Sequence, residues 1–75
     1  MKVTVRLIGP LAYTAGFSEK EITLAASATA ADALAHVHLG KARQTIVTRN
    51  GRAIADHDGL EDGDRLTVSP VYSGG

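Results

Sequence analysis

The chain has 75 residues, with eight Lys and Arg balanced by eight Asp and Glu, and it has no cysteine. A chain of this length forms one domain and buries only roughly 60–65% of its unfolded surface, which leaves little interior for a substrate cavity. A self-contained enzyme is therefore disfavoured, and thiolate chemistry and disulfides are excluded. The neutral charge, with only two Tyr and one Phe, also disfavours a nucleic-acid partner, which requires a basic stripe.

Two strands are expected near the N-terminus. Alternation of apolar and polar residues over Lys2–Ile8 is typical of a strand with one face on a core. Gly9 begins a loop in which Gly16 supplies a left-handed bend, and a second strand over Glu21–Ala25 completes a hairpin. No apolar run is long enough for a membrane span or a signal peptide, so we predict a cytoplasmic protein with no membrane partner.

Thr29 marks the start of the one main helix. Its hydroxyl can accept a backbone N–H, while the carboxylate of Asp32 lies at the positive helix end, as in a capping box. The apolar residues that follow at helical spacing are Ala30, Ala33, Leu34 and Val37. This spacing predicts about two to three turns packed on a sheet, with Gly40 as the C-terminal stop.

Asn50-Gly51 predicts a second hairpin, because both central residues of a type I′ turn need positive φ. The preceding Thr45–Thr48 is β-branched throughout, and Arg52–Ile54 returns as a short strand. A polar loop over residues 56–64 then leads to the last strand.

The last strand, Arg65–Ser69, decides the topology. A helix between the second and third strands can cross the sheet, which lets the first and last strands pair in parallel at its centre. The predicted fold class is therefore α+β, a β-grasp with a mixed sheet and one main helix across one face. We expect a single domain over residues 1–75, in which Pro70 ends the sheet and residues 72–75 form a flexible tail.

Three segments resemble those of the ubiquitin-like sulfur carriers. They are the opening Val5–Leu11, the turn Leu60–Asp64 and the ending Ser69–Gly75, which closes with a diglycine. The resemblance extends along the whole chain; it is strongest to the small subunit of molybdopterin synthase, with the thiamine-pathway carrier second. It implies a ubiquitin-like β-grasp fold and a carrier that acts with a partner enzyme.

The resemblance also implies that the chemistry is done on Gly75 by a partner. A ubiquitin-activating-type adenylyltransferase would use ATP to adenylylate the terminal carboxylate, and sulfur would replace AMP to give a thiocarboxylate. This group would donate sulfur in molybdenum or tungsten cofactor biosynthesis, with the large subunit of molybdopterin synthase as a partner and no cofactor bound by the chain. Glycine suits this role, because Gly74 and Gly75 lack a Cβ and can thread a narrow channel.

Apolar and small residues around the tail are expected to bind the partner. These are Ile8, Leu60, Val71, Tyr72 and Ser73. Exposed apolar side chains at the root of a reactive tail would form a surface for a partner to grip, although Leu60, Val71 and Tyr72 could equally be buried. Ile8 and Ser69 stand where synthase small subunits often carry aromatic anchors, so a thiamine or tRNA-thiolation pathway stays open as an alternative.

Two other functions are open for the same tail. One is a ubiquitin-like protein modifier that joins Gly75 to lysines of other proteins. The other is a plain β-grasp interaction module, in which the two glycines are only a frayed end.

Other candidate sites are weaker, and no metal site is predicted. The loop 56–64 is acidic but fails the EF-hand pattern, which needs Gly at its sixth position and Glu at its twelfth. His36 and His38 are two residues apart on a helix and point in different directions, which disfavours zinc binding. No spacing supports a Ser-His-Asp triad.

Overall fold

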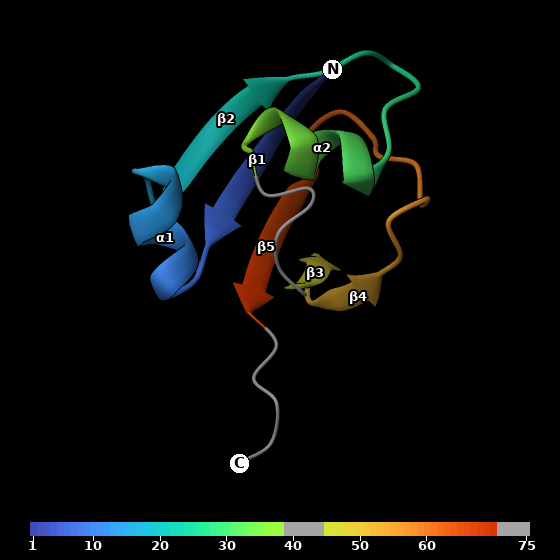
Figure 1. Ribbon diagram of the computed structural model, residues 1–75. Helices are drawn as coiled ribbons and strands as arrows, with labels where there is room; N and C mark the ends of the chain where they lie inside the picture. The colour runs from blue at the N-terminus through green and yellow to red at the C-terminus, as the bar shows by residue number, and fades with distance from the viewer. Residues whose placement is uncertain (39–44, 71–75) are drawn as a thin grey trace.

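The computed structural model describes residues 1–38 and 45–70, which form one sheet with two helices (Figure 1). The elements are β1 (Lys2–Leu7), α1 (Pro10–Ala15), β2 (Glu19–Thr23), α2 (Ala30–His36), β3 (Thr45–Arg49), β4 (Arg52–Ile54) and β5 (Arg65–Pro70). The strand order is β2-β1-β5-β3-β4, with α2 across one face. The predicted β-grasp arrangement is confirmed.

The first and last strands pair at the centre of the sheet. β1 and β5 run parallel, with Val5 opposite Leu66 and Leu7 opposite Val68. β3 lies antiparallel on the other side of β5, and β2 lies antiparallel to β1. The chain therefore reaches Pro70 between two neighbouring strands, at the lower end of β5 in Figure 1.

The core lies between the sheet and α2. Alternate residues of β1 and β5 face inward, and the helix contributes the apolar stripe predicted from its spacing. The buried apolar side chains are Val3, Val5, Leu7, Leu11, Ile22, Ala30, Ala33, Leu34, Val37, Val47, Leu60, Leu66 and Val68. Thr29 and Asp32 form the predicted capping box: Thr29 N donates to Asp32 Oδ2 at 2.8 Å, and Asp32 N donates to Thr29 Oγ1 at 3.4 Å.

The segment after β1 differs from the prediction, because it contains a short helix, α1, where a loop was expected. Pro10 is compatible with the first helical turn, since its missing N–H would be unpaired there and its φ is already helical. Gly16 ends the helix with φ 86°, and its N–H donates to Ala12 O at 2.9 Å. The helix turns the chain back early, so β2 begins at Glu19, two residues before the predicted strand.

The remaining turns follow the sequence closely. Asn50 and Gly51 have φ values of 52° and 85°, as the predicted type I′ turn requires. Pro70 still belongs to β5, opposite Thr45, because a missing donor is tolerated at the last position of a strand. α2 ends at His36 with Val37 as its C-cap, and the predicted stop at Gly40 lies outside the described residues.

Candidate functional site

The end of β5 positions the candidate site. Val68 is fully buried and fixes the strand between β1 and β3. Pro70 is the last described residue of the chain. The site residues predicted at positions 71–75 (Val71, Tyr72, Ser73, Gly74 and Gly75) lie outside the described residues. The described part of the site is the surface around the end of β5, from which these residues continue.

Three residues form a row across the sheet at the end of β5, on the face opposite α2. Ile46 of β3 lies opposite Ser69 of β5, and Ile8 N donates to Val68 O at 3.0 Å, which places Ile8 on the other side of β5. Successive strand residues point to opposite faces, so this row faces away from the buried Val68. We call Ile8, Ser69 and Ile46 the root patch.

The root patch carries two of the large apolar side chains that the described surface exposes. Ile8 is 37% exposed and Ile46 is 46% exposed. Exposed apolar side chains that cluster at a strand end are a common feature of protein-binding surfaces, because contact with a partner removes them from water. The structure therefore places the predicted Ile8 at the surface next to β5, as partner binding would need.

Leu60 does not belong to this surface. Its side chain is only 6% exposed and packs in the core. Its N–H donates to Ala28 O at 3.0 Å, next to a bridge between Thr29 and Gly59. These contacts hold the loop before β5 against the start of α2 and turn Leu60 inward. The prediction that Leu60 forms part of the partner-binding surface is therefore corrected: Leu60 is a core residue.

Two ion pairs on the same face of the sheet lie away from the root patch, while Arg6, two residues before Ile8 on β1, is exposed on that face beside the patch. Lys2 Nζ lies 3.9 Å from Glu21 Oε1, and Arg65 Nη2 lies 3.5 Å from Glu19 Oε1. These side chains are more than half exposed, so each pair contributes little to stability. Together with the exposed Arg6 of β1, these pairs give the face a charged half over β1 and β2, whereas the three residues of the root patch itself carry no charge.

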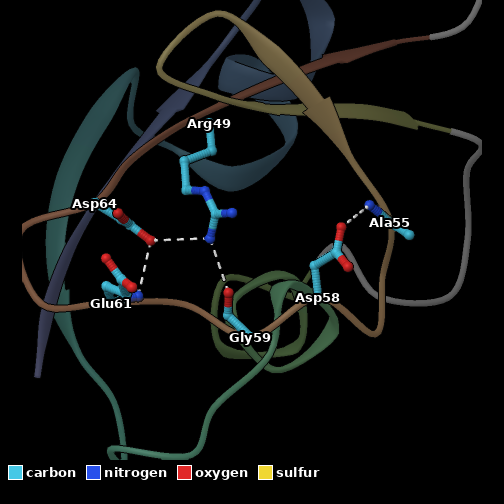
Figure 2. Close-up of polar contacts among 6 residues, drawn as sticks. All are labelled: Arg49, Ala55, Asp58, Gly59, Glu61 and Asp64. Atoms are coloured by element: carbon cyan, nitrogen blue, oxygen red, sulfur yellow. Dashed lines mark hydrogen bonds and ion pairs between the residues drawn. The ribbon is translucent and has the colours of Figure 1, made fainter.

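In the acidic loop 56–64, the carboxylates of Asp58 and Asp64 are used within the fold (Figure 2). Asp64 Oδ2 accepts from Glu61 N at 2.8 Å and lies 3.5 Å from Arg49 Nη1, which also donates to Gly59 O at 2.8 Å. We call these four residues the Asp64 cluster. Asp58 Oδ2 similarly accepts from Ala55 N at 2.8 Å. The predicted polar loop is present, and the structure adds that Asp64 within it is buried and hydrogen-bonded.

Within residues 1–38 and 45–70, no three ligating side chains come together as a metal site would require. His36 and His38 are both exposed. Among the same residues, neither helix is long and apolar enough to span a membrane.

Sequence reasoning missed Ile46. It was placed in a β-branched strand, Thr45–Thr48, without deciding which residues face the core. The signal was available: alternation makes either Ile46 or Val47 face outward, and the pairing fixed by the Asn50-Gly51 turn sets Val47 opposite Ile54. The isoleucine is thus the outward residue, which places a second apolar side chain beside β5.

Comparison with known proteins places this geometry in context. The family model named ThiS family matches residues 5–75. A search of curated proteins gave no match.

Solved structures give the same picture. SAMP1 from Haloferax volcanii is 29% identical, with a TM-score of 0.83 and full coverage of both chains. A structure described as molybdopterin converting factor subunit 1 from Pyrococcus furiosus is 24% identical, with a TM-score of 0.83; 93% of this chain and 97% of that one are covered. A chain from the complex of subunits 1 and 2 of molybdopterin-converting factor from Helicobacter pylori is 23% identical, with a TM-score of 0.66 and full coverage of both.

Proposed function

The chain belongs to the ThiS family of ubiquitin-like carriers and modifiers, and from this premise we propose that Gly75 carries sulfur as a terminal thiocarboxylate. The observation that supports this most directly is the position of β5. The strand is held between β1 and β3, so the chain leaves the sheet at its centre, beside the uncharged root patch. A partner that binds this patch has the C-terminal residues within its reach.

The proposed chemistry takes place in the active site of a partner enzyme. A free carboxylate is a poor electrophile, so an oxygen of the Gly75 carboxylate first attacks the α-phosphorus of ATP, and pyrophosphate leaves. The terminal sulfur of a persulfide then attacks the acyl carbon, the C–O bond breaks and AMP leaves. A thiol supplies the electrons that break the remaining S–S bond and release the thiocarboxylate.

Glycine at positions 74 and 75 serves this chemistry through its size. The activating enzyme must bring an oxygen of the Gly75 carboxylate and the α-phosphorus of ATP within about 3–3.5 Å of each other, which favours a narrow channel. A tail without Cβ atoms can enter such a channel and adopt backbone angles closed to other residues. ATP is a substrate of the activating enzyme in this scheme, and this chain binds no cofactor of its own.

We assign two partners to the root patch by their roles. One is a ubiquitin-activating-type adenylyltransferase, and the other is the enzyme that receives the sulfur. The Helicobacter pylori structure, a complex of subunits 1 and 2 of molybdopterin-converting factor, supports a large subunit of molybdopterin synthase as the receiver. Molybdenum or tungsten cofactor biosynthesis is therefore the proposed pathway, with thiamine biosynthesis or tRNA thiolation as the alternatives.

A second candidate function is protein modification through Gly75. It is favoured by the likeness to SAMP1, a structure also described as small archaeal modifier protein 1. The acyl adenylate is shared by both functions; in the second, a lysine amine in place of sulfur attacks the acyl carbon and an isopeptide bond forms. The two functions therefore differ in the nucleophile and not in this chain.

Intact mass spectrometry of the protein isolated from its native cells tests the proposal. We expect a species heavier by the exchange of one oxygen for one sulfur, located on the C-terminal peptide. Gly75→Ala should remove this species while thermal unfolding stays unchanged. Gly59→Ala is the matched control, since a Cβ at Gly59 meets nothing within 4 Å and the site is far from the tail in sequence.

Two results would contradict the sulfur proposal. Gly75 linked to lysines of other proteins, without any thiocarboxylate, would assign the chain to protein modification. Full activity of a chain that lacks Gly74 and Gly75 would leave only a role as an interaction module.

A further inference from the structure

A shallow groove lies beside α1, and none of the residues that line it belongs to the root patch. Its volume is about 340 Å³, and it is lined by Ala12, Tyr13, Gly16, Phe17 and Ser18. Tyr13 is 93% exposed, so its ring is almost free of contacts with the rest of the fold. Gly16 leaves the groove open, because a Cβ there would meet nothing within 4 Å. The fold thus presents two aromatic rings around a surface depression.

A positive charge lies at the rim of this groove. Lys20 Nζ is 5.5 Å from the centroid of the Phe17 ring, within range of a cation–π contact. Glu19 and Glu21, the neighbours of Lys20 on β2, point to the opposite face, where they pair with Arg65 and Lys2. Across the described part of the chain, Lys20 forms no ion pair of its own. Its charge is available to a ligand.

We propose that this groove binds a short acidic segment of a partner protein. An apolar side chain of the segment packs between Tyr13 and Phe17, and a neighbouring carboxylate pairs with Lys20. Aromatic residues are frequent anchors at protein interfaces, and a complementary charge at the rim orients the partner and speeds its association. The inference goes beyond the proposed function, since it needs neither Gly75 nor the root patch.

Other occupants fit the groove less well. Small-molecule sites enclose most of their ligand, whereas a groove with one wall 93% exposed leaves its occupant largely in solvent. A second copy of the chain offers a poor match on the described residues. Its large exposed apolar side chains are Ile8, Tyr13 and Ile46, and none of them has an acidic neighbour in sequence. The acidic loop has Leu60, but that side chain is buried.

Titration of the full-length, ¹⁵N-labelled protein with peptides tests the proposal. The probe is acetyl-Asp-Glu-Leu-Asp-Glu-amide, and the controls replace Leu by Ala or every acidic residue by Lys. We expect amide shifts at Ala12, Tyr13, Gly16, Phe17 and Ser18 with the acidic Leu peptide only. A chain without Gly74 and Gly75 should bind in the same way, so failure of the sulfur proposal leaves this result untouched.

Variants of exposed residues locate the contacts without disturbing the core. Lys20→Glu should weaken binding about fivefold, because attraction becomes repulsion at a partly solvated rim. Tyr13→Ala should weaken binding by a similar factor, about fivefold, through loss of an aromatic anchor. Lys2→Gln is the matched control on the neighbouring strand, and it should change the affinity by less than about twofold, since screening limits distant charges.

Several results would overturn the proposal. These are the absence of groove shifts at millimolar peptide, equal binding of the basic peptide, or unchanged affinity of Lys20→Glu. Groove shifts that depend on protein concentration alone, with no peptide present, would identify a second copy of the chain as the occupant and would also refute it.

Discussion

The loop before β5 and the surface at the end of β5 lie at opposite ends of the same strand and use their residues in opposite ways. The loop 56–64 is rich in carboxylates, the residue type that suggests a binding site, yet Asp58 and Asp64 accept hydrogen bonds from the nearby backbone N–H groups of Ala55 and Glu61. The root patch has no charged residue, yet Ile8 and Ile46 remain 37% and 46% exposed on the described surface.

This difference shows that residue type alone does not tell which end of the strand offers a binding surface. A polar group whose hydrogen bonds are satisfied inside the fold has little left to offer a ligand. An apolar side chain that is left in water can still contribute to binding, because its burial in a complex is favourable. The exposed isoleucines are therefore the better candidates for a binding surface, whereas Asp58 and Asp64 stabilise the turn.

Leu60→Ala should have the largest effect, and it tests whether the loop is structural. We expect a loss of about 2–4 kcal/mol in the free energy of unfolding, because a buried leucine leaves a cavity when truncated. Urea denaturation measures this directly. Ile46→Ala is the control, an apolar truncation at an exposed site that should cost less than about 0.5 kcal/mol. Equal losses in the two variants would remove the distinction between the regions.

Ile46→Asp tests the other side of the comparison. A carboxylate in the middle of an apolar contact must lose its water on binding, so we expect partner affinity to fall by about 2 kcal/mol, roughly thirtyfold. Isothermal titration with the sulfur-accepting subunit measures the change. Thr23→Asp places the same charge on the same face of the sheet but at β2, and it should bind normally. A similar loss in both variants would point to overall charge as the cause.

Asp64→Ala sharpens the assignment of the acidic loop. Loss of this acceptor leaves Glu61 N without its partner and Arg49 without its ion pair, which should cost about 1–2 kcal/mol of unfolding free energy. Thermal and urea unfolding both report it. Asp56→Ala serves as the control, because that exposed carboxylate makes no hydrogen bond within the described residues. A stable Asp64→Ala variant would return the loop to the list of candidate binding sites.

Glu19→Gln should have the smallest effect. The pair with Arg65 is exposed, so its loss should change the free energy of unfolding by less than about 0.5 kcal/mol, and less still at high salt. Denaturation at two salt concentrations checks both points. A loss above 1 kcal/mol would show that the charged half of the face is part of the structural framework.

Much of the fold could be predicted because local and long-range signals agree. Thr29 and Asp32 cap the helix as expected, and Asn50-Gly51 turns the second hairpin with the positive φ values that its residues favour. α1 could not be predicted with the same ease. It has one turn and a half, and its apolar anchor, Leu11, is recognisable only once β5 is known to lie against it.

The candidate site was only partly predictable for a related reason. Ile8 was chosen from the family resemblance, as the position at the end of the first predicted strand where a partner anchor is expected, and it does lie beside β5 at the surface. Leu60 was misplaced because its burial depends on a bridge between Thr29 and Gly59, a contact between segments that are distant in sequence. Ile46 was missed because its direction depends on strand register. The burial of Leu60 and the outward direction of Ile46 both depend on pairing between distant segments, which no single segment of the sequence encodes.

The parallel pairing of β1 with β5 also constrains how the protein is made. β1 leaves the ribosome first but can pair with β5 only when that strand, encoded some sixty positions later, has been made. The hydrogen bond from Lys2 N to Asp62 Oδ1 spans a similar sequence distance. Long-range pairing of this kind slows folding. A nascent chain that stops before β5 has no strand to join β1 to β3, so the row of Ile8, Ser69 and Ile46 forms only when the last strand is in place.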